Sequence, residues 1–471
     1  MNSRAQKSIG SVLSAKSQFA LVLFAAAAFH LAFAHWQLAP LILVYIGCLI
    51  ELTRAETPRQ AFYFGLTLGF LVFAPELAFF YNIFGPAAVP LWLVLAFWHA
   101  LFLYLGQRAR SILPSDAAIL LLPIFWTGLE YFRSELYPLK FSWLAPAFAL
   151  GPNAATHVLG SYGTTFVLMF ICATLTFAAG KRRVIFSILT IIALSLLLQI
   201  PPPTDTESSA KTVRIAGMQL EFPVELEVPA KLDLLKQKHP DADIYVLSEY
   251  TFDGPIPKCV RAWCKRNSAY LIVGGKDPAP NRDFYNTAFV VDPNGEIIFK
   301  QVKAVPIQFF KDGLPAPEQK LWNSPWGKIG LCVCYDLSYT RVIDRLVRQR
   351  AQIIINPTMD VADWGAAQHQ LHSLIPPVRA AEYRIPIFRL ASSGISEVVD
   401  ANGQRLATAP FASEESTIAA ALPLSQGAKL PLDRFATPFC VGITALACLY
   451  FAFAKADRQR QIRADKKHYQ G

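Results

Sequence analysis

The pattern of hydrophobic residues divides the chain into three parts. Residues 19 to 200 consist mostly of long apolar runs, residues 204 to 430 alternate short apolar runs with polar segments, and residues 435 to 454 are apolar again. An α-helix needs about 20 apolar residues to cross a bilayer. The pattern therefore predicts a membrane protein that carries one soluble domain.

By this rule we expect eight membrane-spanning helices, of which the second is short. They cover residues 19–35, 38–52, 60–82, 88–107, 116–133, 159–180, 184–200 and 435–454. The first stretch also fits a cleaved signal peptide, because basic residues precede an apolar core that ends in Ala32-Phe33-Ala34, a small-x-small sequence. The later spans keep their orientation in either case.

The spans set the expected domain boundaries. We predict a membrane domain with seven helices over 1–200, a linker over 201–212, a soluble catalytic domain over 213–430, and an eighth helix with a basic tail over 431–471. The linker begins with three prolines, which cannot continue a helix, and then becomes polar.

Basic residues indicate the orientation of the chain. The loops near residues 36 and 85 contain no lysine or arginine. The alternate loops and both ends contain them, at Arg4, Lys7, Lys16, Arg54, Arg59, Arg108, Arg110, Lys181, Arg182, Arg183, Lys455, Arg458, Arg460, Arg463, Lys466 and Lys467. Because lysine and arginine stay on the cytoplasmic side, we expect both termini in the cytoplasm. The soluble domain then lies outside, at the periplasmic face of a bacterial inner membrane.

Composition supports the membrane assignment and argues against a nucleic-acid partner. Hydrophobic residues make up 53% of the chain and charged residues only 17%. The net charge of +10 and the pI near 9.1 come from basic residues beside the apolar spans, where they set topology. We therefore expect a membrane and no nucleic acid among the partners.

The soluble part alternates short β-type runs with helical stretches. The expected strands are VRIAGMQL, ADIYVLSE, AYLIVGG, NTAFVVD, EIIFKQ, KIGLCVC, AQIIINP, IPIFRLAS, SEVVDANG and STIAAAL. Such alternation predicts an α/β layered domain, although periodicity does not give the order of the layers.

Three of these strands end in residues that suit acyl-transfer chemistry. The strand Lys328 to Val333 leads to Cys334, the strand that begins at Ala242 leads to Glu249, and the hairpin Asn286 to Phe299 leads to Lys303. A thiol becomes a nucleophile when a neighbouring base takes its proton, and a cation stabilises the thiolate and the oxyanion. A lone cysteine is more often a buried apolar residue, so the prediction depends on the carboxylate and the ammonium group.

At this point the chain resembles the nitrilase, or carbon-nitrogen hydrolase, superfamily over about Val213 to Leu422, with a Glu, Lys, Cys triad in that order. Residues 355–365, INPTMDVADWG, are similar to the family's Asn-Asp-x-Trp-Phe-Gly loop. Residues 379–403 are similar to its Arg-Ala-x-Glu helix, strand and Gly-Ile-Ser hairpin. The resemblance implies a four-layer αββα sandwich.

With the apolar helices included, the chain resembles the membrane-embedded apolipoprotein N-acyltransferase family over nearly its whole length. Residues 126–144 and 160–169 are similar to that family's fifth span exit and sixth span entry. The resemblance implies transfer of a fatty acyl chain from a phospholipid to the N-terminal amine of a diacylglyceryl-cysteine lipoprotein, through a thioester and without a cofactor. Tyr335 and Asp336, directly after the nucleophile, are expected to support it.

The chain departs from the family pattern in two places. The family spacing gives Lys303 when it is counted from the hairpin glycine, Gly295, and Lys300 is the alternative. The family's loop glutamate is missing, and the only acid nearby is Asp312. Asp336 stands where these acyltransferases usually have glutamate. These departures bear on acceptor and lipid specificity.

Other candidate residues have simpler interpretations. His369 and His372 have the spacing of two metal ligands but no third ligand, so we expect no metal site. Asp360 and Glu382 are interpreted as structural carboxylates, and Cys332 as a core residue. A disulfide between Cys259 and Cys264 is an alternative to two free thiols.

Three charged residues in the apolar spans are candidates for function. Glu130 and Arg133 are interpreted first as a surface ion pair at a helix end, and second as substrate contacts. Glu76 follows Pro75 inside the third span, where a carboxylate is a candidate for function or for a lipid headgroup contact.

The sequence leaves three function classes open. The first is the acyltransferase described above. The second is a membrane-tethered amidase, or an acyltransferase with a different amine acceptor. The third is a silent membrane scaffold or transporter, which the presence of Glu249, Lys303 and Cys334 argues against.

Overall fold

The computed structural model describes residues 14–177, 211–411 and 415–468, without the side chains beyond residue 453. The predicted seventh span, most of the predicted linker, Arg4 and Lys7, and the basic side chains of the C-terminal tail lie outside this description. The chain forms two compact units. One contains residues 1–133, 162–195 and 433–471, and the other contains residues 134–161 and 196–432.

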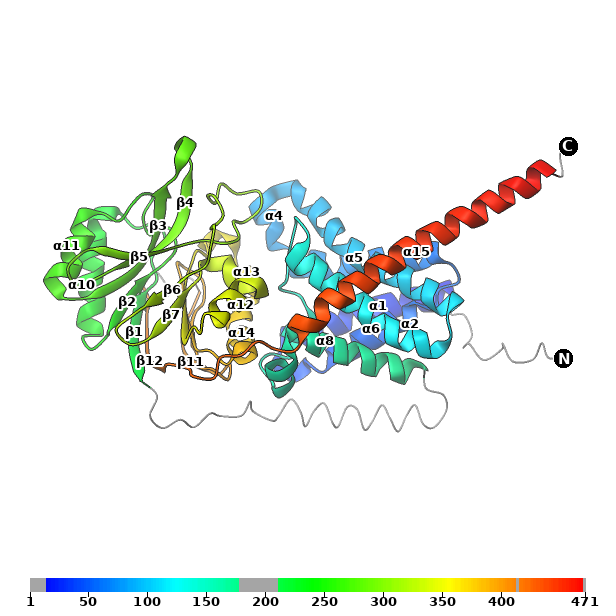
Figure 1. The fold of residues 1–471 in the computed structure, drawn as a ribbon, viewed down its shortest axis with the longest axis horizontal. Coiled ribbons are helices and arrows are strands. Elements are labelled where there is room, and N and C mark those ends of the chain that lie inside the picture. The colour runs from blue at the N-terminus through cyan, green and yellow to red at the C-terminus, as the bar shows by residue number, and fades with distance from the viewer. Residues whose placement is uncertain (1–13, 178–210, 412–414, 469–471) are drawn as a thin grey trace. The chain divides into compact units, whose positions relative to one another are not determined.

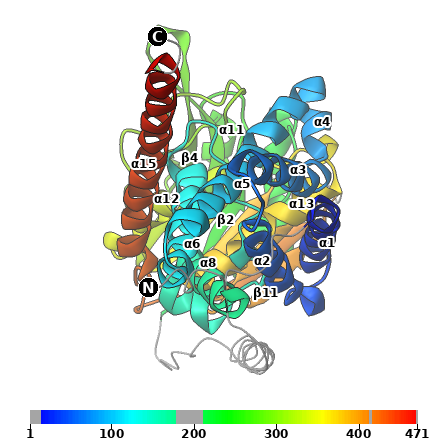
Figure 2. The same cartoon turned by 90° about the vertical axis from the view of Figure 1, so that its right-hand side faces the viewer.

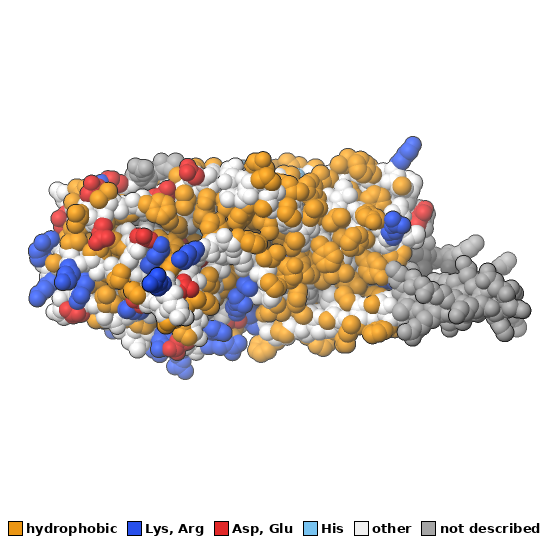
Figure 3. All heavy atoms as spheres, turned by 90° about the horizontal axis from the view of Figure 1, so that it is seen from above, with side chains coloured by type: hydrophobic (Ala, Val, Ile, Leu, Met, Phe, Trp, Pro, Cys, Tyr) orange, Lys and Arg blue, Asp and Glu red, His pale blue; other side chains and the backbone are white. Residues whose placement is uncertain are grey.

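The first unit is helical (Figures 1 and 2). Its helices are α1 (Ala15–Ala34), α2 (Leu41–Leu52), α3 (Pro58–Glu76), α4 (Phe79–Phe84), α5 (Ala88–Ile112), α6 (Ser115–Tyr131), the later part of α8 (Ala154–Phe177) and α15 (Asp433–His468). On the face that Figure 3 shows, hydrophobic side chains predominate on this unit, whereas most charged side chains lie on the other unit. This distribution is typical of a helical bundle in lipid.

Within the described residues, four helical stretches are long and apolar enough to cross a membrane, and α2 is a shorter apolar helix. They are Ala15–Ala34, Phe79–Ile112, Ala154–Phe177 and Asp433–Phe453. The helices of the unit fall at the predicted apolar stretches, with ends shifted by several residues. The count of eight spans stays a prediction.

Small residues bring helices α3 and α5 close together. A Cβ atom at Gly65 would lie 2.6 Å from the Cα of Ala100, and one at Gly69 would lie 2.6 Å from the Cα of Ala96. The four residues form matching rows one turn apart. Such rows let two helices approach within lipid, where burial of apolar surface does not drive association.

A proline explains the unusual carboxylate of the third predicted span. Pro75 has no N–H, so the carbonyl of Leu71 is free to accept a hydrogen bond from elsewhere. The imidazole of His30 lies there, with Nε2 2.9 Å from that carbonyl and Nδ1 2.6 Å from the Glu76 carboxylate. Helix α3 ends at Glu76, before the predicted boundary, because the proline weakens its last turn. Glu76 therefore joins α1 to α3.

The interpretation of Glu130 and Arg133 as a surface ion pair is wrong. Their side chains are only 3% and 5% exposed, because α6 packs between α5 and α15. The guanidinium of Arg133 lies 5.3 Å from the centre of the Phe73 ring. These two charged residues belong to the interior of the helical unit.

The second unit contains two six-stranded sheets. The first has the order β12-β1-β2-β3-β4-β5, formed by Thr417–Pro423, Thr212–Met218, Ile244–Leu247, Tyr270–Pro278, Phe284–Val291 and Ile297–Val302. The second has the order β11-β10-β9-β8-β7-β6, formed by Arg405–Ala409, Ser396–Val399, Ile387–Ala391, Ile353–Thr358, Lys328–Leu331 and Leu321–Asn323. Each sheet has three parallel strands at its centre, β1-β2-β3 and β7-β8-β9.

Helices cover both outer faces of the sheet pair (Figure 1). Helices α10 (Val228–Lys238) and α11 (Lys258–Asn267) pack on the first sheet, and α12 (Thr340–Arg348), α13 (Ala366–His372) and α14 (Ile375–Tyr383) pack on the second. The unit is therefore the expected αββα sandwich. The prediction of the fold class, a helical membrane bundle with this sandwich, is confirmed.

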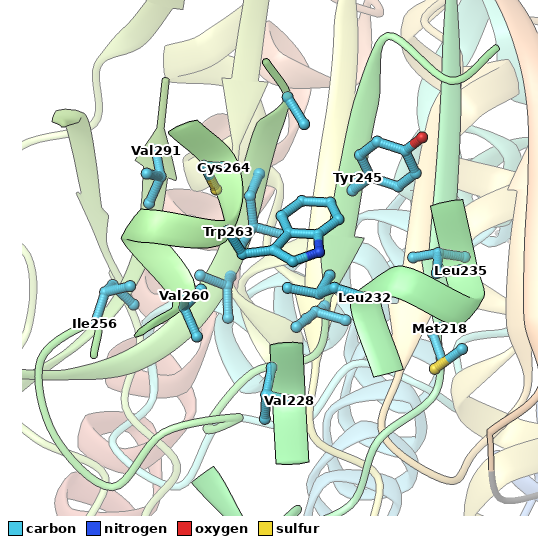
Figure 4. Packing of buried hydrophobic residues seen from close by; sticks show 14 of the residues in the cluster. Met218, Val228, Leu232, Leu235, Tyr245, Ile256, Val260, Trp263, Cys264 and Val291 are labelled. Atoms are coloured by element: carbon cyan, nitrogen blue, oxygen red, sulfur yellow. The ribbon is translucent and has the colours of Figure 1, made fainter. Parts of the chain in front are cut away.

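The core under α10 and α11 shows why these two segments form helices. Leu232, Val260 and Trp263 project from one face of each helix onto strand residues such as Tyr245 (Figure 4). Trp263 is fully buried, and its indole N–H donates to the Asp233 carboxylate at 2.6 Å. Burying a side chain of this kind contributes roughly 1.5–3 kcal/mol to folding.

Two strands were not predicted. Strand β6 has only three residues, and strand β11 is largely exposed. Neither carries the run of β-branched apolar residues that indicates a buried strand. The other ten strands fall on the predicted runs.

Residues 134–161 belong to the same compact unit as the sheets, although the apolar pattern predicts a membrane domain up to residue 200. This segment contains the short helix α7 (Pro146–Ala149) and the start of α8, which is interrupted at Gly160 with φ 79°. Its Trp143, Ser142 and Glu135 contact residues after β7. The segment is thus part of the surroundings of the predicted nucleophile.

Candidate active site

Glu249, Lys303 and Cys334 follow three strands that end in the same region of the sandwich. Glu249 comes two residues after β2, Lys303 directly after β5, and Cys334 three residues after β7. All three side chains are buried, with 0–2% of each residue exposed. The structure therefore brings the three predicted residues together, and their catalytic role stays a prediction.

The Glu249 carboxylate is held by three donors. Oε1 accepts from Lys303 Nζ at 2.9 Å and from Asn286 Nδ2 at 2.6 Å, and Oε2 accepts from the backbone N–H of Met359 at 2.7 Å. Burial raises the pKa of Glu249, and the nearby Asp312 carboxylate raises it further, against the attraction of Lys303. A carboxylate with a raised pKa is suited to accept a proton at neutral pH.

Lys303 lies between two carboxylates. Its Nζ is 2.9 Å from Glu249 Oε1 and 2.8 Å from Asp312 Oδ2. Burial alone would lower the pKa of this lysine, but the two carboxylates outweigh burial and raise the pKa well above its ordinary value. The ammonium group therefore keeps its charge inside the domain.

The alternative lysine lies elsewhere. Lys300 forms an ion pair with Asp277 at 2.8 Å, with 47% of the lysine side chain exposed. It is not among the partners of Glu249. The geometry therefore favours Lys303, which the spacing from Gly295 gives, over Lys300.

Asp312 has a larger part in the site than the sequence indicates. Its carboxylate accepts from Lys303, from the Tyr250 hydroxyl at 2.7 Å, from Asn286 Nδ2 at 2.8 Å and from the Ile307 N–H at 2.7 Å. Burial would raise the pKa of Asp312, but Lys303 and these donors outweigh it and lower the pKa. Asp312 thus supplies a permanent negative charge, which leaves Glu249 as the carboxylate that gains and loses a proton.

Asn286 was not predicted from the sequence. Its side-chain amide donates to Glu249 and to Asp312, and its backbone carbonyl accepts from the Lys303 N–H at 2.8 Å. It is fully buried at the third position of β4. A buried asparagine inside a hydrophobic hairpin strand was the available signal, because such an amide needs polar partners.

Cys334 adopts an unusual backbone conformation. Strand β7 ends at Leu331, earlier than predicted, and Cys334 begins a 3-10 turn (Cys334–Ser338) with φ 51°. This left-handed conformation is costly for a residue with a Cβ atom and occurs preferentially at functional sites. Residues 335–338 are all buried, so the polar residues that follow Cys334 form a buried turn and not an exposed loop.

The thiol of Cys334 and the predicted base contact the same residue. The thiol contacts the Met359 carbonyl at 3.6 Å, and the Met359 N–H donates to the Glu249 carboxylate at 2.7 Å. Burial raises the pKa of the Cys334 thiol well above its ordinary value, as does Glu249, whereas Lys303 opposes the shift. The resting thiol is therefore protonated, and its activation requires a base in contact with it.

Asp336 holds the loop that follows Lys303. Its carboxylate accepts from the backbone N–H groups of Ala304 at 2.9 Å, Val305 at 2.8 Å and Val333 at 3.2 Å. Burial raises its pKa to about 6, although these donors oppose the shift. Asp336 thus joins the strand end before Cys334 to the loop after Lys303.

Tyr335 faces the segment that precedes α7. Its ring lies 5.8 Å from that of Trp143 and 4.9 Å from that of Tyr339, both in edge contacts. The Trp143 indole N–H donates to the Ser338 hydroxyl at 3.0 Å. The turn that carries the cysteine is thus packed against aromatic rings on one side.

The two histidines of the HxxH sequence have other partners. His372 Nδ1 donates to the Asp360 carboxylate at 2.8 Å, and its ring stacks on that of Trp143 with centres 4.7 Å apart. Burial lowers the pKa of His372 to about 4, so it is neutral at pH 7. His369 packs on the Phe411 ring. Among the described residues, no three His, Cys, Asp or Glu side chains are grouped so that they could hold a metal ion.

The remaining candidates have structural contacts. Asp360 forms a buried ion pair with Arg389, and Glu382 forms one with Arg379. The Cys332 thiol accepts from Asn356 Nδ2 at 3.4 Å in the core. The eight cysteines, Cys259 and Cys264 included, are free.

Two known protein families match different parts of the chain. The carbon-nitrogen hydrolase family matches residues 222–431. The N-terminal domain of the apolipoprotein N-acyltransferases matches residues 25–174. Residues 175–221 separate the two matches, which together cover most of the chain.

Two of the curated relatives match over nearly the whole length, and a third matches over a short part. Apolipoprotein N-acyltransferase of Shewanella oneidensis is 24% identical over 91% of this chain and 94% of its own, and that of Geobacter metallireducens is 21% identical over 88% and 91%. A deaminated glutathione amidase of Dictyostelium discoideum is 30% identical over 22% of this chain and 40% of its own.

Similar solved structures cover about half of the chain. A Saccharomyces cerevisiae member of branch 10 of the nitrilase superfamily aligns with a TM-score of 0.41 and 18% identity, over 47% of this chain and 93% of its own. A carbon-nitrogen hydrolase from Helicobacter pylori aligns with a TM-score of 0.41 and 17% identity, over 52% and 95%.

Proposed function

We propose that this chain, which belongs to the apolipoprotein N-acyltransferase family, moves a fatty acyl chain from a phospholipid to the N-terminal amine of a diacylglyceryl-cysteine lipoprotein. The reaction passes through a thioester on Cys334. The observation that carries the mechanism is the buried Glu249 carboxylate, which accepts from the Lys303 ammonium group and from the N–H of Met359, the residue whose carbonyl contacts the Cys334 thiol.

In the first half-reaction Glu249 takes the proton of the Cys334 thiol as sulfur attacks the ester carbonyl of the lipid. The charge that develops on the carbonyl oxygen is stabilised by Lys303 and by a backbone N–H after the nucleophile. The C–O bond then breaks, and the leaving alkoxide takes the proton from Glu249. A lysophospholipid departs, and the acyl chain stays on sulfur.

In the second half-reaction the lipoprotein's amine attacks the thioester. Glu249 takes a proton from the nitrogen, the C–S bond breaks, and the thiolate receives that proton. The product is an amide. Because Asp312 balances the charge of Lys303, Glu249 can change its protonation in each step while the pair beside it stays ionised.

The helical unit supports a lipid substrate over a small amide. An enzyme that acts on soluble amides gains nothing from helices that cross a membrane, whereas both proposed substrates have acyl chains in the bilayer. We place the protein in the bacterial inner membrane with the catalytic domain on the periplasmic side, because lysine and arginine avoid the loops near residues 36 and 85.

The test is intact-mass analysis of the purified full chain after incubation with phosphatidylethanolamine. We expect one added acyl group on the wild type, and its transfer to a synthetic diacylglyceryl lipopeptide as an amide. Cys334→Ala should abolish both products, and Cys334→Ser should nearly do so. Cys259→Ala, which changes a half-buried cysteine on α11, is the matched control and should keep both.

Two outcomes would contradict the proposal. Full transfer by Cys334→Ala would exclude this thiol as the nucleophile. Release of ammonia from a small amide, without an acyl adduct from any lipid, would indicate an amidase.

A further inference from the structure

The segment before α7 lies against two parts of the candidate site. The Pro138 carbonyl accepts from Gln308 Nε2 at 3.3 Å, and Gln308 belongs to the loop between Lys303 and Asp312. The Lys140 carbonyl lies 3.4 Å from the Tyr335 hydroxyl, one residue after the predicted nucleophile. The segment thus runs beside the loops that carry the lysine and the cysteine.

This arrangement places two basic residues next to the Cys334 turn. Lys140 is half-buried in the segment, and Arg341 is half-buried at the start of α12. The Arg341 guanidinium lies 5.4 Å from the centre of the Tyr339 ring, whose hydroxyl is 3.5 Å from the Lys140 carbonyl. The two basic residues therefore flank the same tyrosine.

Neither cation forms an ion pair within the part of the chain that the structure describes. The Arg341 guanidinium donates to the backbone carbonyl of Glu135 at 3.2 Å, and the Glu135 carboxylate accepts from Thr340. Burial and the charge of Arg341 lower the pKa of Lys140, against the attraction of the Glu135 carboxylate. Two cations that repel each other in a half-buried position are stabilised when an anion binds between them.

We propose that Lys140 and Arg341 bind the phosphodiester group of the phospholipid acyl donor. This inference rests on the proposed function. Phosphatidylethanolamine and phosphatidylglycerol each carry one negative phosphodiester a few bonds from their acyl esters, so an ester carbonyl at Cys334 brings the phosphate close to the residues around Tyr335. An ammonium group and a guanidinium group are the side chains that bind phosphate most strongly.

The proposal predicts a specificity that does not depend on the headgroup beyond the phosphate. Phosphatidylethanolamine and phosphatidylglycerol share the phosphodiester, so both should use the site. A neutral acyl ester such as p-nitrophenyl palmitate has no phosphate and should not. The comparison of these donors separates headgroup binding from the chemistry at Cys334.

The test measures acyl-enzyme formation by the full chain with each donor. Lys140→Ala and Arg341→Ala should each raise KM for both phospholipids about tenfold with little change in kcat, and the double variant should raise it further. Acylation by p-nitrophenyl palmitate should stay within about twofold of the wild type. Lys238→Ala, on an exposed lysine at the end of α10, is the matched control and should change neither donor.

The outcomes distinguish the two proposals. If the wild type forms no acyl-enzyme with either class of donor, the proposed function fails. If the wild type reacts with both and the variants lose both equally, the function stands and the phosphate site is refuted. Competitive inhibition of the phospholipid reaction by millimolar inorganic phosphate that disappears in the double variant would support the site. Binding of inorganic phosphate that is lost in the double variant, while KM for both phospholipids is unchanged, would assign the site to a free anion and overturn the headgroup assignment.

Discussion

The ammonium group of Lys303 lies 2.8 Å from the carboxylate of Asp312 inside the domain, and each of the two side chains is 5% or less exposed. Asp312 is not one of the three residues that the family pattern identifies, yet it lies as close to the lysine as Glu249 does. Two carboxylates therefore share one cation. The pKa of Glu249 is raised and that of Asp312 is lowered, so the two carboxylates have different roles. Asp312 stays ionised, and Glu249 is free to exchange a proton.

Removing the charge of Asp312 should impair catalysis more than folding. We expect Asp312→Asn to lower kcat for acyl transfer about 100-fold. Without the Asp312 charge, the attraction of Lys303 lowers the pKa of Glu249, which makes Glu249 a weaker base. Steady-state kinetics with a phospholipid donor and a lipopeptide acceptor measures the effect. The control is Asp277→Asn, which removes the partner of the exposed Lys300 and should leave kcat within about twofold. Equal effects of the two variants would contradict the assignment.

Removing Lys303 should destabilise the domain. Lys303→Met leaves Glu249 and Asp312 buried beside each other without a cation, and breaking a buried pair in this way costs about 3–5 kcal/mol. Lys300→Met breaks an exposed pair and should cost about 1 kcal/mol or less. Thermal unfolding of the purified protein in detergent at pH 7 measures both. A midpoint of Lys303→Met equal to that of Lys300→Met would show that the buried charges are not coupled as the distances indicate.

The sequence predicted the site residues that lie at strand ends, but not the contacts between loops. Glu249, Lys303 and Cys334 were accessible because each follows a β-type run, and the ends of such runs meet at one edge of a layered sheet. The contacts of Asn286 and Tyr250 with Asp312, and of Asn286 with Glu249, were not, because these residues come from segments far apart in the sequence. A sequence pattern indicates periodicity, but it does not give the contacts between loops.

The fold was predictable where hydrophobic periodicity was strong. Ten strands and the alternation with helices follow from runs of β-branched residues, whereas the short β6 and the exposed β11 lack that signal. Residues 134–161 were assigned to the membrane part because they lie between apolar runs, yet they pack in the sheet unit. Their anchors are single polar and aromatic contacts such as Trp143 to Ser338, which carry no periodicity.

The pH dependence of activity should report on Asp336. Its folded pKa of about 6 lies above the ordinary value of 3.8, so the folded state binds the proton more tightly than the unfolded state does. The resulting stabilisation is complete below pH 3.8 and is lost as pH rises through about 6. Function should change in the opposite direction, because only the ionised carboxylate accepts from three backbone N–H groups. We therefore expect activity to fall as pH drops below about 6.

Asp336→Asn separates these two effects. Residue 336 cannot ionise in this variant, so its activity should be low at every pH. The pH profile should therefore lack the acid limb, which is the fall in activity below about pH 6. Its thermal midpoint relative to the wild type should rise with pH between 4 and 7, by the equivalent of about 3 kcal/mol. An unchanged acid limb in Asp336→Asn would assign the titration to another group.

Glu135 should position the cysteine turn from the segment before α7. Its Oε1 accepts from the Thr340 N–H at 2.9 Å and from the Thr340 hydroxyl at 2.8 Å, so it caps α12 two residues after the turn Cys334–Ser338 ends. Loss of a helix cap costs about 1–2 kcal/mol. We expect Glu135→Ala to lower the thermal midpoint and to lower kcat more than it changes KM, because the turn that fixes the thiol loses its support. Glu135→Gln keeps an acceptor oxygen and should restore kcat to within about twofold of the wild type. If both variants lose stability while kcat is unchanged, Glu135 stabilises the domain without positioning Cys334.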